Sequence, residues 1–340
     1  MQQLRRLRRY LRMRLVSFAG APTAGETHIG VLVPLGAALD AHTHVCDLSA
    51  AYAADGAGEP LSKRGGMREL LEIAEESGGF GRAAAAAASG RWRIALSDVK
   101  LLAPINNSEK VVCVGMNYYD HCTEQNFPVP KEPLLFSKFA SSLCASGDDL
   151  PLDETLTKEL DFEVELCIVV GRHARNVPKE EALSYIAGWT VTHDVSMRDL
   201  QFKHNGGQWL LGKAGDLMAP IGPSIVTRDE GAPFTDAGNL GVRTFLNGER
   251  VQNSNTRELI HTPADVISYA SRYFTLKPGD LILTGTPGGV GVFRKPPLFL
   301  KDGDVVTCEI DGLGKVTNKV TAIPPPPGMG GGPAPKRAKL

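Results

Sequence analysis

The chain has 340 residues, of which 42% are hydrophobic and 22% charged, with a formal net charge of -1. This composition is typical of a globular protein with a large core and excludes a chain that is mostly disordered. No apolar run approaches the roughly 18 residues that span a bilayer, so we expect no membrane span.

Basic residues at the two ends of the chain offset a net negative charge in the residues between them. Residues 1–14 hold six Arg, and three basic residues lie in the last five. Removing them leaves 37 - 6 - 3 = 28 basic against 38 acidic residues, about -10. This balance argues against nucleic-acid binding, which needs a basic face. An anionic substrate would then need a local positive centre, for which a metal ion is a candidate.

The first 14 residues predict a targeting segment. Leu4, Leu7 and Leu11 recur at helical spacing among arginines, and the first acidic residue is Glu26. An Arg-rich, acid-free amphipathic segment is typical of mitochondrial transit peptides, which favours the mitochondrial matrix. A basic surface helix or a misassigned start codon is the alternative.

Residues 15–105 predict a small N-terminal domain. Short strands are expected at 14–18, 29–34 and 44–48, a helix at 67–76 and an alanine run at 83–88.

Residues 106–322 predict a larger domain in which strands dominate. Strands are expected at 111–114, 162–170, 189–193, 242–246, 281–284 and 305–310, and helices at 179–186 and 263–274. Thr262 is the expected N-cap before Pro263, and Asn247-Gly248 predicts a hairpin. Because the strands do not alternate regularly with helices, we predict an α+β fold with a mixed β-rich core rather than a doubly wound sheet. The six cysteines form no CxxC pair and are expected to be reduced core residues.

The strongest chemical signal is a pair of glutamates, Glu163 and Glu165, in the run 161–171. Side chains alternate along a strand, so both glutamates should point to one face. From Leu166 the run is apolar on both faces, which indicates a strand entering the interior, where unpaired carboxylates are costly. A third acid, Asp194, ends the next strand, and three oxygen ligands favour Mg²⁺, Mn²⁺ or Ca²⁺ over Zn²⁺. A half-exposed strand with a polar outer face is the alternative.

Three further features could carry chemistry. His121 and Glu124 stand at i, i+3 and could form a general base with its orienting carboxylate, or a common helix-surface pair. Backbone N–H groups of the glycine-rich loop 285–291 could bind a substrate carboxylate, or the loop could be a plain tight turn. Lys213, in a mostly apolar stretch, could neutralise an enolate or reach the surface.

The tail, residues 323–340, is rich in Pro and Gly and cannot pack a core. Its last residues, Ala338-Lys339-Leu340, approximate a peroxisomal signal, so a peroxisomal or cytoplasmic location is the alternative to mitochondria, and an unselected tail is the alternative to a signal.

The larger domain resembles the fumarylacetoacetate hydrolase family over about residues 105–322. The resemblance is carried by VGMNYYDHCTE, DFEVELCIVVG, AGWTVTHDVSMRDLQ, QWLLGKAGD and PGDLILTGTPGGVGVF. It implies a mixed, rolled β-sheet core with covering helices, in a homodimer. One departure is Met197, where relatives usually carry Ala; it could narrow the pocket.

The resemblance also implies roles for individual residues. Glu163, Glu165 and Asp194 correspond to ligands of Mg²⁺ or Mn²⁺. His121 and Glu124 correspond to a catalytic dyad on a closing loop. Gln201, Lys213 and Thr286 correspond to substrate contacts, and Lys213 also to a catalytic group.

The implied reaction passes through an enolate of a small oxo-acid. With the apparent import segment, the first choice is keto-enol tautomerisation of oxaloacetate. Hydrolysis of acylpyruvates or fumarylacetoacetate-like β-diketones, and decarboxylation of oxaloacetate, are the alternatives among enzymes, and a catalytically silent scaffold is the alternative outside them.

Overall fold

The computed structural model describes residues 13–20, 25–35, 38–54, 61, 65–228 and 234–324. Most of the predicted targeting segment, residues 1–12, and most of the predicted tail, residues 325–340, lie outside this range.

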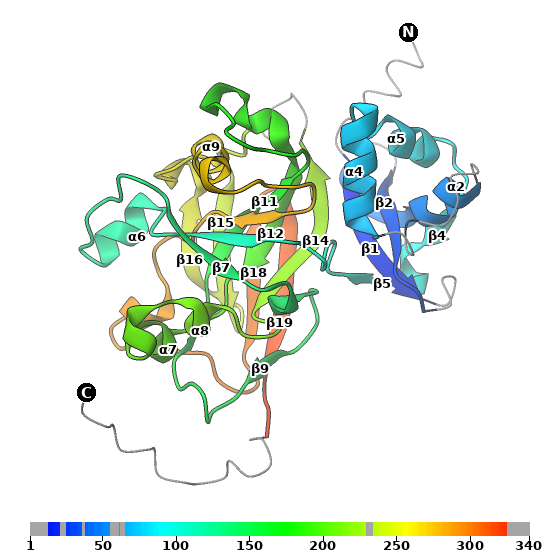
Figure 1. Ribbon diagram of the computed structural model, residues 1–340. Helices are drawn as coiled ribbons and strands as arrows, with labels where there is room; N and C mark the ends of the chain where they lie inside the picture. The colour runs from blue at the N-terminus through cyan, green and yellow to red at the C-terminus, as the bar shows by residue number, and fades with distance from the viewer. Residues whose placement is uncertain are drawn as a thin grey trace.

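Within the described residues the largest sheet has 12 strands (Figure 1). In spatial order its main path is β4 (Arg93–Ala95), β3 (Ala38–Asp47), β2 (His28–Leu35), β1 (Arg14–Gly20), β14 (Ala219–Thr227), β12 (Ile186–His193), β11 (Val164–Val170), β17 (Leu281–Leu283), β6 (Val111–Gly115) and β7 (Leu134–Lys138). Off this path, β5 (Val99–Leu102) pairs with β1, and β8 (Leu143–Cys144) pairs with β14. The pairs β17–β6 and β14–β8 are parallel and the remainder antiparallel, so the sheet is mixed.

Two smaller sheets complete the β structure of the described chain. One has five strands: β16 (Glu249–Asn255), β15 (Gly241–Leu246), β18 (Val305–Ile310), β19 (Gly314–Ala322) and β9 (Leu150–Leu152). The other pairs β10 (Leu160–Asp161) with β13 (Ser196–Met197). The predicted hairpin joins β15 to β16, where Asn247 and Gly248 both have positive φ, as a tight hairpin turn requires.

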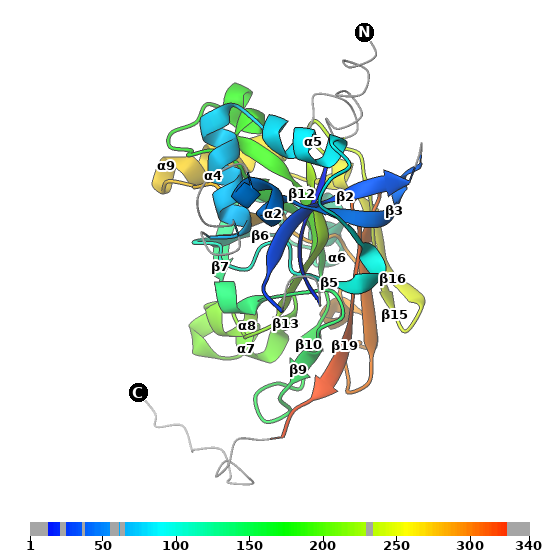
Figure 2. The same cartoon turned by 90° about the vertical axis from the view of Figure 1, so that its right-hand side faces the viewer.

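Helices cover the edges and faces of these sheets. The α-helices described are α2 (Leu48–Ala54), α4 (Met67–Ser77), α5 (Gly81–Ala88), α6 (Tyr119–Glu124), α7 (Arg198–Phe202), α8 (Leu210–Lys213) and α9 (Pro263–Tyr273). The 3₁₀ segments are η2 (Leu96–Asp98), η3 (Ala140–Ser142), η4 (Lys179–Tyr185), η5 (Asn205–Gly207), η6 (Thr256–Glu258) and η7 (Gly291–Phe293). In both views α7 and α8 lie together at the end of the molecule away from α5 (Figures 1 and 2).

The strands of residues 14–102 belong to the same 12-stranded sheet as β11 and β12. Strand β1 pairs with β14 through Leu15 and Ile225, and Arg14 reaches the carbonyl oxygens of Gly312 and Leu313. The division of the chain into two domains at residue 105 stays a prediction.

Strand β11 is buried on both faces, and its two faces belong to different cores. Val164, Leu166 and Ile168 lie in the core shared with the five-stranded sheet and α9. Cys167 and Val169 lie in the core covered by α2, α4 and α5. This alternation confirms the strand prediction and makes the alternative of a half-exposed polar face wrong.

Two predicted elements differ in detail. The strand expected at 162–170 begins at Val164, because the Phe162 N–H bonds the Asp161 carboxylate and the Val164 N–H bonds the Gln252 side chain. The helix expected at 179–186 is a 3₁₀ segment, η4, which ends where β12 begins at Ile186. By contrast, α9 has the expected cap, since the Thr262 hydroxyl accepts from the Asp265 N–H in a capping box. The predicted α+β class is confirmed.

Candidate active site

The three predicted metal ligands meet at the ends of two paired strands. Glu165 lies in β11, Glu163 precedes that strand, and Asp194 follows β12. The register pairs Val164 with His193, and the Asp194 N–H donates to the Glu163 carbonyl at 2.8 Å. One oxygen from each of the three carboxylates lies within 4.8 Å of the others. The backbone ladder therefore brings the carboxylates together.

Three buried cations surround these carboxylates. The Lys213 ammonium lies 2.8 Å from Glu163 Oε2 and 2.8 Å from Asp194 Oδ2. The Lys138 ammonium lies 2.9 Å from Asp194 Oδ1. Arg198 lies 2.5 Å from Glu163 Oε1 and 2.8 Å from Asp161 Oδ2. Lys213 is only 2% exposed, so it does not reach the surface.

The neighbouring charges shift the pKa values of Glu163 and Glu165 in opposite directions. Burial opposes ionisation of Glu163, but the charges of Lys213 and Arg198 outweigh it and lower its pKa to about 2. Burial and the charges of Asp194 and Glu163 raise the pKa of Glu165 well above its usual range. Within the described residues Glu165 forms no ion pair, although its Oε2 accepts the Gly285 N–H at 2.7 Å. Glu165 is thus the carboxylate that most needs a further cation.

The site fits a hard divalent ion on charge and on ligand chemistry. The centre has four buried carboxylates, Asp161, Glu163, Glu165 and Asp194, and three buried cations, Lys138, Arg198 and Lys213. With every group ionised, its net charge is therefore one negative. All three candidate ligands offer carboxylate oxygen, the donor that Mg²⁺, Mn²⁺ and Ca²⁺ prefer. Adding a divalent ion would turn this centre positive and suited to an anionic substrate.

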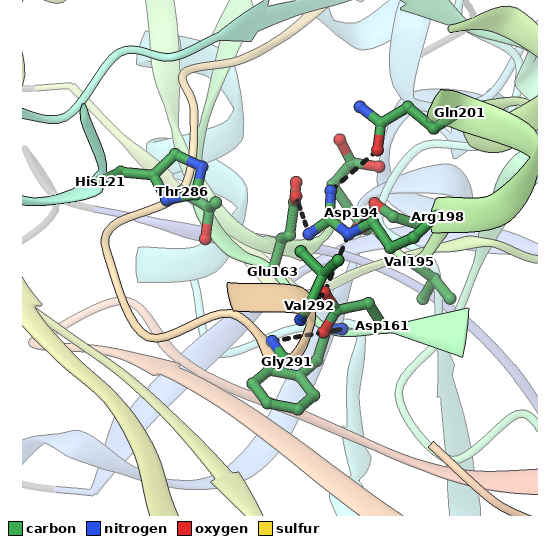
Figure 3. Close-up of polar contacts among 12 residues, drawn as sticks. His121, Asp161, Glu163, Asp194, Val195, Arg198, Gln201, Thr286, Gly291 and Val292 are labelled. Carbon is green, nitrogen blue, oxygen red and sulfur yellow. Dashed lines mark hydrogen bonds and ion pairs between the residues drawn. The ribbon is translucent and has the colours of Figure 1, made fainter. Parts of the chain in front are cut away.

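Arg198 links the carboxylate centre to the glycine-rich loop. Its Nε binds Asp161, whose carboxylate also accepts the N–H groups of Gly291 at 2.7 Å and Val292 at 3.0 Å (Figure 3). Its Nη1 donates to Gln201 Oε1 at 2.9 Å. Arg198 therefore fixes the orientation of Gln201, the residue expected to contact substrate.

The predicted dyad forms on α6. His121 Nδ1 lies 2.6 Å from Glu124 Oε1, which orients the imidazole. Because an ionised carboxylate can only accept, Nδ1 carries the proton, and in the neutral ring Nε2 is the acceptor. The Gln125 amide lies 2.8 Å from Nε2. The juxtaposition of His121 and Glu124 is confirmed, whereas their catalytic role stays a prediction.

The glycine-rich loop uses its backbone differently from the expectation. Four of its N–H groups, and that of the following Val292, bind carboxylates of the protein itself. Gly285 binds Glu165, Gly288 binds Asp120, Gly289 binds Glu124, and Gly291 and Val292 bind Asp161. These amides are therefore committed to holding the active-site acids. The same loop places Thr286, whose hydroxyl accepts from Gln252 Nε2 at 2.9 Å.

One cavity of about 130 Å³ joins these groups. Its polar lining is His121, Gln125, Glu163, Glu165, Arg198, Gln201, Lys213 and Thr286. Its apolar lining includes Met116, Phe127, Leu134, Phe136, Phe202, Trp209 and Phe293. Figure 3 shows His121 and Thr286 on one side of Glu163 and Arg198 and Gln201 on the other.

All the predicted site residues are therefore at one place in the fold. Asp194 lies beneath the cavity wall, held between Lys138 and Lys213. Met197 does not line this cavity, so it does not narrow the pocket as expected; its side chain packs in the core. The residues that sequence reasoning missed are Lys138, Asp161, Arg198 and Gln125. A signal for Lys138 was available, since it shares a strand face with Leu134 and Phe136 and must find acidic or carbonyl partners there.

None of the described helices is both long and apolar enough to cross a bilayer.

Comparison with known proteins places these features in one family. Residues 110–321 match the family model described as fumarylacetoacetate hydrolase, C-terminal. The mitochondrial oxaloacetate tautomerase of Xenopus laevis is 51% identical over 254 residues, covering 75% of this chain and 78% of the relative. That of Rattus norvegicus is 45% identical over 308 residues, covering 91% of each. The solved structure of a fumarylacetoacetate hydrolase from Exiguobacterium antarcticum superposes with a TM-score of 0.71 at 32% identity, over 92% of this chain and 100% of that one. On these findings, the chain belongs to the fumarylacetoacetate hydrolase family.

Proposed function

We propose that this protein is a Mg²⁺-dependent oxaloacetate tautomerase. The observation that carries the proposal is that one small cavity is lined by Glu163, Glu165 and Lys213 and by the imidazole of His121. A centre that could stabilise negative charge on a substrate oxygen thus faces His121, a base that could move a proton. The tautomerase relatives from Xenopus laevis and Rattus norvegicus support oxaloacetate as the substrate.

Glu163, Glu165 and Asp194 would hold the ion, which would act as a Lewis acid toward negative charge on the substrate oxygens. Mn²⁺ or Ca²⁺ could be held by the same oxygen ligands. Glu163 and Asp194 hold the ammonium of Lys213 at the cavity wall. This ammonium would donate a hydrogen bond to the substrate oxygen on which negative charge develops. Gln201 and Thr286 would position the carboxylates of the substrate.

His121 would move the proton. Glu124 binds Nδ1, so Nε2 of the neutral ring would take a proton from C3 of the keto form as C2–C3 gains double-bond character and the C2 oxygen gains charge. Transfer of this proton from His121 to that oxygen would complete the enol and restore the neutral imidazole, and the reverse sequence would return the keto form. Gln125, which now occupies the hydrogen-bonding position at Nε2, would be replaced there by substrate.

The volume and lining of the cavity help to choose between a small oxo-acid and an acylpyruvate as the substrate. Its volume of about 130 Å³ suits a small substrate and lies well below the roughly 300–1,000 Å³ of sites for drug-sized ligands. Its aromatic lining, including Phe127, Trp209 and Phe293, favours hydrolysis of an acylpyruvate with an apolar tail as the second candidate.

The test follows the enol absorbance of oxaloacetate and of an acylpyruvate with purified protein and Mg²⁺. We expect faster equilibration of oxaloacetate tautomers without net loss of oxaloacetate. Net loss of oxaloacetate would indicate decarboxylation, and loss of acylpyruvate absorbance would favour the hydrolase. If neither compound reacts while the protein binds metal, both enzyme proposals fail and a silent scaffold is favoured.

We also propose a location in the mitochondrial matrix and a homodimeric assembly. The relatives named as mitochondrial support the first, together with the Arg-rich segment 1–14. Deleting residues 1–12, which leaves β1 intact, should release a fluorescent fusion from mitochondria; a fusion displaced only by deletion of residues 338–340 would contradict this. Light scattering of the purified protein tests the dimer.

A further inference from the structure

Lys138 is a buried cation that the proposed reaction does not use. Its side chain is fully buried at the end of β7, outside the lining of the active-site cavity. Burying an unpaired ammonium costs free energy of folding, so the groups that contact this ammonium indicate its role.

Those partners are all parts of the carboxylate centre or of the segments that hold it. The ammonium lies 2.9 Å from Asp194 Oδ1. This contact is an ion pair without a hydrogen bond, since the ammonium donates instead to the carbonyl oxygens of Val195 at 3.1 Å and Met218 at 2.9 Å, and to that of Lys213. One ammonium therefore connects the segment after β12, the end of α8 and the residue before β14 to the strand β7.

The two oxygens of Asp194 are thus held by two different lysines. Lys138 pairs with Oδ1 from outside the cavity, while Lys213 pairs with Oδ2 and also with Glu163 Oε2. With Oδ1 fixed, the carboxylate cannot rotate about its last bond without breaking an ion pair. Lys138 also binds the backbone carbonyl of the residue that carries the second lysine.

We propose that Lys138 is a positioning residue for the metal centre: it presents Asp194 to the ion and fixes the backbone of Lys213, without itself touching ion or substrate. This inference rests on the proposed metal site at Glu163, Glu165 and Asp194. Partners of this kind, which orient a ligand from behind, commonly change metal affinity by about 10- to 100-fold when removed.

The test is Mn²⁺ binding, measured by electron paramagnetic resonance in the absence of substrate, together with thermal unfolding. The principal variant is K138Q, whose amide can still donate to backbone carbonyls but carries no charge toward Asp194. We expect the Kd for Mn²⁺ to rise by about tenfold or more in folded K138Q. The companion variant K138R keeps the charge and should bind Mn²⁺ more tightly than K138Q.

A matched control is K110Q. Lys110 also pairs with a fully buried aspartate of the same sheet, 3.3 Å from Asp280 Oδ2, but has no contact with the metal centre. K110Q should lose stability and bind Mn²⁺ within about twofold of the wild type, because distant sites act independently.

Folded K138Q with wild-type Mn²⁺ affinity overturns the proposal, as does an equal loss of affinity in K110Q. If K138Q does not fold, K138R decides: Mn²⁺ affinity within about threefold of the wild type supports the role, and a loss of about tenfold or more in folded K138R overturns it. Failure of the wild type to bind Mn²⁺ would instead overturn the metal site itself. None of these outcomes depends on which reaction the enzyme performs.

Discussion

The carboxylate centre and the histidine dyad face the same cavity, but the chain fixes them in different ways. Glu163, Glu165 and Asp194 are set by the backbone pairing of β11 with β12 and by buried cations. The dyad lies on α6, a helix of six residues that is held to the rest of the protein largely through side chains. Metal binding should therefore depend on the core of the sheet, and proton transfer on a smaller and more easily moved element.

The anchoring of α6 illustrates the second mode. Asp120 accepts from the Ser254 hydroxyl at 2.5 Å and from the Gly288 N–H at 3.2 Å. Glu124 binds His121 with one oxygen and the Gly289 N–H with the other, at 2.7 Å. The two ends of the helix are thus attached to the loop that also holds Glu165 and Asp161.

The largest effect is expected from E165A, which breaks the first region. Loss of one of three ligands should abolish measurable Mn²⁺ binding and lower tautomerase activity by at least about a hundredfold. Isothermal titration with Mn²⁺ and the enol assay measure the two effects. The exposed hairpin variant E249A is the control, and Mn²⁺ binding by folded E165A at wild-type affinity would contradict the assignment.

H121A should separate the two regions. Removal of a general base commonly costs about 10²- to 10⁴-fold in kcat, whereas the carboxylate ligands remain in place. We expect kcat to fall by that factor with Mn²⁺ affinity unchanged. H173A serves as the control, because His173 is an exposed histidine paired with Glu75. Retention of full activity by H121A would remove the base from the mechanism.

A smaller effect is expected from D120N, which weakens the anchor of α6 without changing the dyad. The amide keeps only one accepting oxygen, and a net hydrogen-bond loss of about 1 kcal/mol corresponds to roughly a fivefold change. We predict a fall in kcat/KM of about this size and faster hydrogen exchange in residues 119–124. D153N, at an exposed turn, is the control; unchanged exchange in D120N would show that the anchor lies elsewhere.

T262A should affect stability alone. The hydroxyl caps α9, and loss of such a cap lowers the free energy of unfolding by about 1 kcal/mol. Denaturant unfolding measures this change, and T262S should restore most of it. A tautomerase defect in folded T262A would mean that α9 is coupled to the active site.

Much of the carboxylate centre could be predicted from the sequence because it depends on the spacing of neighbouring residues. The period of two aligned Glu163 with Glu165, and the apolar continuation from Leu166 placed both in the interior. The spacing of His121 and Glu124 likewise predicted their contact. Only the family resemblance joined the two groups into one site, since nothing local relates α6 to β11.

The partners of these acids could not be predicted because they lie far away in the chain. The Gly285 N–H is 120 residues from Glu165, and the Gly288 N–H is 168 residues from Asp120. Local reasoning therefore left the glycine-rich loop as either a binder of a substrate carboxylate or a plain tight turn, whereas its amides bind the protein's own acids. For the same reason the ion pair of Arg198 with Asp161, 37 residues away, could not be predicted.

Anomalous diffraction from crystals grown with Mn²⁺ and oxalate, an unreactive dicarboxylate with two adjacent carbonyl groups, tests the central claim most directly. We predict one strong manganese peak with oxygens of Glu163, Glu165 and Asp194 at roughly 2.0–2.6 Å and oxalate oxygens completing the coordination in the cavity facing His121. A peak elsewhere, or ordered oxalate held without an ion at these carboxylates, would contradict it.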